Sequence, residues 1–212
     1  MEVAQQPNHR PLLWLLAIAL AVRVYVLLVT FCVSKDALWF VPVAQAVAAG
    51  DFRPLLESHQ QPLYPLLIVP FRAFGGSWVL SAQLASLAVG TLTIVPVFQL
   101  TRRVFGPEAA ALAGLLAALL PHHCRFSADA ISDATYIFLF ASAVWLGGAA
   151  VIERRGRDFA LCGALSALAW LTRPEGAGVV LLVCALAALG MVSWLRRDWK
   201  RPALGILVAA LA

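Results

Sequence analysis

The chain has 212 residues, of which 62% are hydrophobic and 13% are charged, and its mean hydropathy is +0.85. Soluble domains carry about 25% charged and about 45–50% apolar residues, so this composition excludes an ordinary soluble protein and indicates a polytopic membrane protein. The formal net charge of +5 does not indicate nucleic-acid binding, because no basic stripe is interleaved with aromatic residues and because Lys and Arg in membrane chains report orientation.

The apolar segments, taken in chain order, predict an all-α bundle of transmembrane helices. A spanning helix needs roughly 20 apolar residues. The first segment, residues 11–33, is too long for a signal peptide and lacks a small-residue cleavage site. Later spans are expected at residues 78–100, 108–121, 134–152, 159–171 and 177–195. We expect one transmembrane domain over residues 1–212, with an incomplete seventh span from Pro202 that indicates the N-terminal portion of a longer domain.

Basic residues predict the orientation of these spans, because an excess of Lys and Arg marks the cytoplasmic side. With the N-terminus inside, ten of the 16 Lys and Arg residues fall in inner loops, and the inverse topology would reverse that bias. We therefore expect an integral protein of the bacterial inner (plasma) membrane with a cytoplasmic N-terminus. Arg23 falls inside the first span and is expected to face other helices or to extend toward the interface.

Residues 34–61 form the longest outer loop. Within it, Asp36 stands at the N-cap position of a predicted helix that ends at Gly50, a favourable residue for a helix C-terminus. An apolar face indicates a helix in the membrane interface; it consists of Leu38, Trp39, Val41, Ala44, Gln45 and Val47. Asp36 could serve only as a cap, or its carboxylate could act as a general base that deprotonates a hydroxyl.

Two predicted spans are too short to cross the bilayer. At 1.5 Å per residue, residues 108–121 and 159–171 each cover about 20 Å of the roughly 30 Å hydrocarbon thickness. The loops that follow them, "HHCRFSADAISD" and "TRPEG", would then lie at membrane depth. Irregular polar backbone occurs there only when it is buried in protein or lines a watery cavity. The sequence therefore predicts a cavity that opens outward.

The stretch "ESHQQPLYP" places polar side chains directly before an apolar segment. Its neutral donors and acceptors could bind phosphate or sugar hydroxyls without the desolvation cost of charges. The candidate substrate-binding residues here are His59, Gln60, Gln61 and Tyr64. The alternative is an ordinary loop whose prolines begin the next helix.

The loop after residue 121 adds Arg125, Asp129 and Asp133 to the candidates. The two aspartates are four residues apart, would share a face of a helix, and either could cap the next span. Adjacent His122 and His123 point apart on most backbones. Because the four cysteines also show no CxxC spacing, no metal site is predicted.

The turn "LTRPEG" places Arg173 and Glu175 between two apolar segments. One interpretation is an internally neutralised pair at a helical hairpin. The other is a functional site, since arginine is favoured for bidentate phosphate contact and ionisable residues at membrane depth are functional candidates.

Four stretches follow one another in a characteristic order: "KDALWFVPVAQAVAAGDF", "HQQPLYPLLIVPFRAFG", "TRRVFG" and "AWLTRPEG". Together they resemble the membrane glycosyltransferases of the GT-C class, in particular the protein O-mannosyltransferase-like and aminoarabinose-transferase-like branch (glycosyltransferase family 39). The resemblance covers essentially the whole chain. It implies a multi-span enzyme that takes a sugar from a polyprenyl-phosphate donor on the outer or periplasmic side.

The resemblance also implies roles for individual residues. Asp36 occupies the place of the family's catalytic carboxylate and would deprotonate the acceptor hydroxyl, while Arg173 or Arg125 would offset charge on the departing phosphate. Ala37 stands where many relatives carry Glu, which argues against a mechanism that needs an acidic pair or a metal bound by one. We assign no cofactor, and a divalent metal stays an open but unsupported alternative. Gln61 replaces the first of two prolines that often follow the family's histidine.

Two other classes of function stay open on the sequence. A transporter or flippase for a lipid-linked anion could use the same cavity and arginines, although transporters often contain internal repeats and no convincing one occurs here. An inactive membrane protein is the third reading. The expected partners are a polyprenyl-phosphate-linked sugar, membrane lipid and an acceptor that the sequence does not identify, with no nucleic acid.

Overall fold

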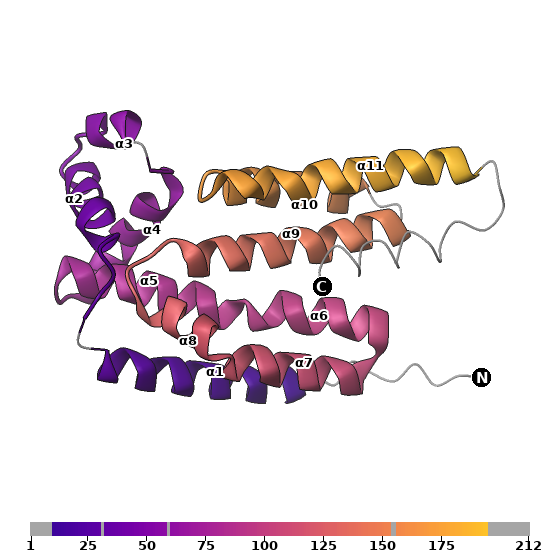
Figure 1. Ribbon diagram of the computed structural model, residues 1–212, viewed down its shortest axis with the longest axis horizontal. Helices are drawn as coiled ribbons and strands as arrows, with labels where there is room; N and C mark the ends of the chain where they lie inside the picture. Colours follow the sequence, from indigo (N-terminus) through magenta and orange to yellow (C-terminus); the bar gives the residue numbers. More distant parts are fainter. Residues whose placement is uncertain (1–9, 31, 59, 154–155, 195–212) are drawn as a thin grey trace. The chain divides into compact units, whose positions relative to one another are not determined.

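The computed structural model describes residues 10–30, 32–58, 60–153 and 156–194, and these ranges contain helices and no strand (Figure 1). The expected all-α architecture is confirmed. The helices are α1 (Arg10–Val29), α2 (Ala37–Ala48), α3 (Arg53–Glu57), α4 (Leu63–Phe71), α5 (Trp78–Leu92), α6 (Ile94–Phe105), α7 (Pro107–Leu119), α8 (Pro121–Ala128), α9 (Asp133–Glu153), α10 (Gly156–Trp170) and α11 (Ala177–Trp194), with 3-10 turns η1 (Arg72–Phe74) and η2 (Pro174–Gly176). The chain divides into two compact units, Met1–Phe138 and Leu139–Ala212, which we describe separately.

Three helices in the described ranges are long and apolar enough to cross a membrane: α1, the α5–α6 pair over Trp78–Phe105, and α9. The pair α7 and α8 would add a fourth span, although it is bent by 54°. The expected count of six spans stays a prediction, and the segment from Pro202 lies outside the described residues. Helix α7 ends at Leu119, so the expected short third segment is confirmed.

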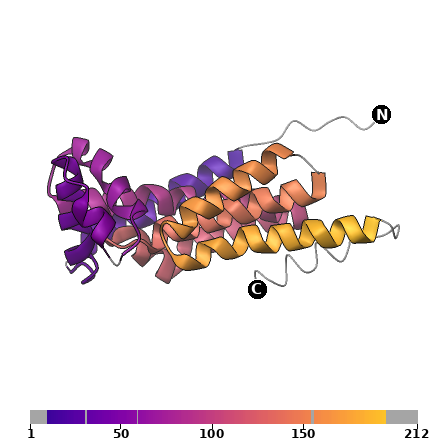
Figure 2. The same ribbon diagram turned by 90° about the horizontal axis from the view of Figure 1, so that it is seen from above.

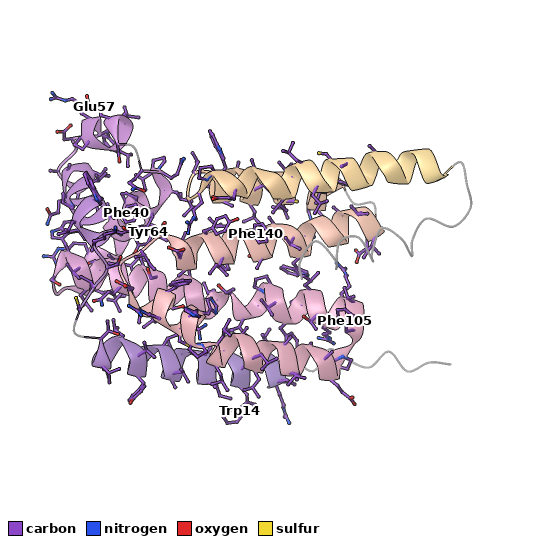
Figure 3. All side chains as sticks on the ribbon, in the orientation of Figure 1. Trp14, Phe40, Glu57, Tyr64, Phe105 and Phe140 are labelled. Carbon is purple, nitrogen blue, oxygen red and sulfur yellow. The ribbon has the colours of Figure 1, made fainter. Side chains whose placement is uncertain are left out.

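Helix α1 presents much of its surface outward. Trp14 and Leu28 are 71% and 74% exposed, as lipid-facing residues of a span would be, and Trp14 points away from the neighbouring helices of its unit (Figure 3). The helix ends at Val29 and not at Val33 as the sequence predicted. A longer helix would need the Ser34 N–H to donate to the carbonyl of residue 30. That N–H donates instead to the Asp129 carboxylate, 2.8 Å away.

Helices α5, α6 and α7 form a hairpin with one interruption. Thr93 separates α5 from α6, and Pro96, which lacks an N–H, follows within the first turn of α6. Helix α6 continues to Phe105, beyond the predicted end at residue 100, and stops at Gly106, whose φ of 92° favours glycine. Pro107 then begins α7 at once, so α6 and α7 run side by side (Figure 1).

The outer loop folds into α2 and α3, and α2 packs on α4. At the end of α2 the Gly50 N–H donates to the Val47 carbonyl and the Asp51 N–H to the Ala46 carbonyl. With a φ of 86° at Gly50, this is a Schellman motif, and the predicted helix end is confirmed. Leu38 and Trp39 of the predicted apolar face are exposed, as side chains that face the membrane interface would be, and the interfacial position of α2 stays a prediction. The buried face consists of Ala37, Phe40, Val41 and Ala44.

Two aromatic rings hold α2 against α4. Phe40 and Tyr64 meet edge to face with their ring centroids 4.9 Å apart, and both side chains are buried (Figure 3). Such pairs add about 0.5–1.5 kcal/mol beyond the burial of their area. In the second unit, α10 and α11 run side by side and are joined through η2 (Figure 2).

Candidate functional site

A buried arginine lies at the centre of the first unit. Arg23 of α1 has no exposed surface, and each of its five N–H groups has a partner within hydrogen-bond distance. Nε donates to Ser127 Oγ (3.2 Å), Nη1 to the carbonyls of Ala19 (3.1 Å) and Ala118 (3.2 Å), and Nη2 to the Ala117 carbonyl (3.4 Å) and His123 Nδ1 (2.9 Å). Arg23 therefore faces other helices, as expected, and has no N–H left for a substrate phosphate.

The bend between α7 and α8 explains why an arginine is needed there. In a continuous helix the Ala117 carbonyl would accept from residue 121, but Pro121 has no N–H. The carbonyls of the last turn of α7 thus lack helical partners, and Arg23 supplies donors to two of them. A cation is also favoured at the negative end of the helix dipole. Arg23 consequently holds the bend that sets the direction of α8.

The predicted divergence of the two adjacent histidines is confirmed. His122 is exposed, whereas His123 is buried against Arg23. Because a guanidinium only donates, His123 Nδ1 accepts the 2.9 Å hydrogen bond and the imidazole is neutral there. Among the described residues, no group of three or more His, Cys, Asp or Glu side chains gathers as metal ligands would.

The segment after α8 is anchored by side chains from several elements. Gln83 Nε2 of α5 donates to the Ala128 carbonyl (3.0 Å), and Ser86 Oγ donates to the Ile131 carbonyl (3.1 Å). Asp129 Oδ1 accepts the N–H groups of Ala130 (2.7 Å) and Ser34 (2.8 Å). All four residues of 128–131 are buried. The outward cavity that the sequence predicts at this loop stays a prediction, and we call residues 128–131 the anchored segment.

Asp36 follows Ser34 by two residues and begins the outer loop's helix. It stands at the N-cap position of α2, yet its side chain makes no capping hydrogen bond. The cap alternative, worth about 1 kcal/mol, is therefore not realised. The carboxylate is half-buried and has no hydrogen bond or ion pair with any residue the structure describes. Its backbone is fixed nonetheless, since the Asp36 N–H lies 3.4 Å from Ser34 Oγ.

The stretch between α3 and α4 carries the next candidates. His59 lies outside the described residues, Gln60 is exposed, and Gln61 is half-buried. Pro62 stands at the N-cap of α4, so the prolines do begin the next helix. A substrate-binding role for the two glutamines stays a prediction.

Tyr64 differs from its neighbours because its side chain is fully buried. Its hydroxyl donates to the Ala82 carbonyl (3.0 Å) and lies 2.8 Å from Ser86 Oγ. Burial raises the pKa of the Tyr64 phenol, so the hydroxyl stays protonated and can donate. In this conformation the hydroxyl is engaged with α5, and a substrate-binding role for Tyr64 stays a prediction.

Arg125 and Asp133 take different positions around the anchored segment. Arg125 is exposed on α8, on the side opposite to the buried His123 and Ser127, and it has no partner among the residues described. Asp133 is the first residue of α9, whereas Asp129 ends α8, so the two aspartates do not share a helix face as the sequence suggested. Residues 129–132 bend and are not part of a helix.

In the second unit, the arginine–proline–glutamate turn follows α10. Arg173 Nε lies 4.0 Å from Glu175 Oε2, and their side chains are 41% and 66% exposed. An exposed ion pair at this distance contributes about 0–1 kcal/mol to stability. Mutual neutralisation of Arg173 and Glu175 is therefore a weak explanation for the motif. Gly176 closes the turn against α10, because a Cβ there would lie 2.7 Å from the Ala169 Cβ. The turn therefore presents both charged groups at its surface.

Comparison with known proteins identifies the family. Residues 59–212 match the model of the dolichyl-phosphate-mannose-protein mannosyltransferase family, and helices of this length and hydropathy define an integral membrane protein. The chain belongs to this family, that is, to the GT-C type of membrane glycosyltransferases. No curated protein and no solved structure in the comparison matches the chain. The matched residues include Arg125 and Arg173 but not Asp36.

Several small polar residues that sequence reasoning passed over hold this region together. Gln83 and Ser86 of α5 and Ser127 of α8 each bond to another segment of the first unit. For Gln83 and Ser86 the signal in the sequence is a polar residue within an otherwise apolar helix, where each unpaired donor or acceptor would cost about 1–3 kcal/mol. That cost implies that each of these polar groups has a hydrogen-bond partner, but it does not show which residue the partner is.

Proposed function

We propose that this protein transfers a sugar from a polyprenyl-phosphate donor to an acceptor hydroxyl on the outer face of the membrane, with Asp36 as the general base. The family supports the class of reaction. The observation that carries the role of Asp36 is its carboxylate at the start of α2, half-buried and without a cap bond or ion pair among the described residues. A carboxylate that serves neither the helix nor a salt bridge is free to accept a proton.

The proposed step is a displacement at the anomeric carbon. The acceptor oxygen forms a bond to that carbon as the bond to the phosphate oxygen breaks, and the acceptor proton passes to Asp36. The polyprenyl phosphate leaves with the electron pair of the broken bond. Its developing charge needs a cation nearby, and Arg125 and Arg173 are our candidates. Arg23 is not, since its N–H groups are all engaged within the protein.

The outward orientation rests on the distribution of basic residues, ten of 16 on the N-terminal side of the membrane. Asp36 and the outer loop then face the periplasm. The side chains of Gln60 and Gln61 follow in the same outer loop, and donor and acceptor would meet there in an outward cavity. That cavity, and the place of His59 in it, belong to the proposal.

A doubly labelled donor tests the proposal. Proteoliposomes that contain the protein are incubated with polyprenyl-phosphate mannose carrying ³H in the sugar and ³²P in the phosphate, together with extracted envelope acceptors. Transfer separates the two labels, with ³H in the acceptor and ³²P in the lipid. Movement of both labels together across the bilayer would instead identify a flippase, and no change in either label would refute both activities for this donor. Liposomes without protein are the control.

A further inference from the structure

We infer that Asp129 is a positioning residue that fixes the location of Asp36 through the main chain of Ser34, and that it is not itself a substrate ligand. This inference rests on the proposed function for its catalytic consequence, but its structural part stands on the hydrogen bonds alone. Asp129 and Ser34 are 95 residues apart in the chain and are joined by a 2.8 Å hydrogen bond.

The acceptor end of this bond is firmly held. Asp129 is 7% exposed, and the same Oδ1 that accepts the Ser34 N–H also accepts the Ala130 N–H at 2.7 Å. The carbonyls on either side of Asp129, those of Ala128 and Ile131, accept hydrogen bonds from α5. Immediately before the anchored segment in the chain, Ser127 Oγ accepts a hydrogen bond from Nε of the buried Arg23. The Asp129 carboxylate therefore lies among residues that are hydrogen-bonded to α1 and α5.

The donor of this hydrogen bond is the N–H of Ser34, which lies two residues before Asp36 in the chain. Ser34 uses its N–H for Asp129, its Oγ lies 3.4 Å from the Asp36 N–H, and its carbonyl accepts the Ala37 N–H at 3.1 Å. The bond therefore holds Ser34 in the stretch between α1 and α2, two residues before Asp36 at the start of α2. A buried carboxylate whose Oδ1 is occupied by two main-chain donors is suited to hold backbone in place.

Two substitutions separate positioning from substrate contact. Asp129→Asn keeps a carbonyl oxygen that can accept both N–H groups but removes the charge, whereas Asp129→Ala removes the acceptor. If Asp129 only positions Ser34, Asn should retain most of the activity and Ala should not. If the carboxylate binds substrate or moves a proton, both variants should fail alike. Lys35→Ala is the matched control, because Lys35 is an exposed neighbour of Ser34 and its replacement leaves both the N–H and the hydroxyl of Ser34 in place.

Two measurements on the intact protein in nanodiscs make the test. Hydrogen exchange of the peptide around Ser34 should be about tenfold faster in Asp129→Ala, as loss of a charge-assisted hydrogen bond predicts, and within about threefold of wild type in Asp129→Asn and Lys35→Ala. In the transfer assay, kcat should fall about tenfold to a hundredfold in Asp129→Ala with the donor KM within about twofold, because a displaced base slows the chemical step.

Unchanged exchange in Asp129→Ala would overturn the inference whatever the activity. An Asp129→Asn variant that folds, exchanges like wild type and yet loses transfer or raises the donor KM more than about tenfold would overturn it as well, since the carboxylate would then act on substrate. Failure of the proposed function is distinct, because a wild-type protein without transfer activity leaves the exchange result to decide the structural claim.

Discussion

Replacement of Arg23 by methionine should destabilise the bend between α7 and α8. Methionine has a similar length and suits an apolar interior, but it offers none of the N–H groups that Arg23 donates. The Ala117 and Ala118 carbonyls would lose donors that α7 itself cannot replace. The variant therefore removes the hydrogen bonds while most of the packing volume is conserved.

The expected loss of stability in Arg23→Met depends on which hydrogen bonds the remaining groups can still form. Ser127 Oγ keeps its donation to the His123 carbonyl at 2.6 Å, and the Ala118 carbonyl keeps the Cys124 thiol at 3.2 Å. The Ala117 carbonyl lies 3.1 Å from His123 Nδ1, which can donate to it once Arg23 is gone. Hydrogen bonds within membranes average about 0.6 kcal/mol and those to charged groups reach about 1.5–3 kcal/mol, so we expect a net loss of about 2–4 kcal/mol.

The assay is unfolding in mixed micelles by SDS titration, followed by far-UV circular dichroism and by thiol labelling of Cys124. Cys124 is only 3% exposed, so its labelling reports opening of α8 when the other three cysteines are replaced by alanine. Arg23→Lys, with three donors on a single nitrogen, should fall between wild type and Arg23→Met. Leu28→Met, at a 74% exposed position of the same helix, should change stability by no more than about 0.5 kcal/mol. An Arg23→Met protein with wild-type stability and wild-type Cys124 labelling would refute the reasoning.

Two further substitutions test the packing around the anchored segment. Gly90→Ala would place a Cβ 2.6 Å from Ser127 Cβ and should cost about 1–3 kcal/mol in the same SDS titration, whereas Gly163→Ala, which meets no atom within 4 Å, should be neutral or slightly stabilising; equal midpoints for the two variants would contradict the contact. Tyr64→Phe removes a buried hydroxyl that has two partners and should cost about 1–2 kcal/mol with the donor KM unchanged, while Tyr25→Phe at a 65% exposed position should change neither quantity. A raised donor KM in Tyr64→Phe alone would assign it a substrate contact instead.

Much of the helical framework was predictable because its signals are local. Apolar length located α1, α5 and α9, and Gly50 marked the end of α2. The third apolar segment was expected to be short at residues 108–121, as α7 (Pro107–Leu119) is. The faces of α2 were harder to predict. Its residues are apolar nearly all round, so the sequence offered little contrast between the buried Phe40 and the exposed Trp39.

The candidate site was predictable in residue type but not in partners. The sequence singled out Asp36 and Asp129 as polar groups beside apolar segments, and it could not show that one positions the loop of the other across 95 residues. It expected an irregular loop after α7, whereas residues 121–128 form a helix once Arg23 has satisfied the carbonyls at the bend. Long-range hydrogen bonds of this kind depend on tertiary structure, which neither periodicity nor spacing encodes.

The most direct test of the proposed reaction is the transfer rate of Asp36→Asn against that of Asp51→Asn in the doubly labelled assay. Both are aspartates of the same outer loop, and Asp51 is an exposed partner of Arg53 at 3.6 Å. We expect Asp36→Asn to lower kcat about a hundredfold to ten-thousandfold with unchanged stability, because asparagine cannot take the acceptor's proton, and Asp51→Asn to retain the wild-type rate. Transfer by Asp36→Asn at the wild-type rate would contradict the account.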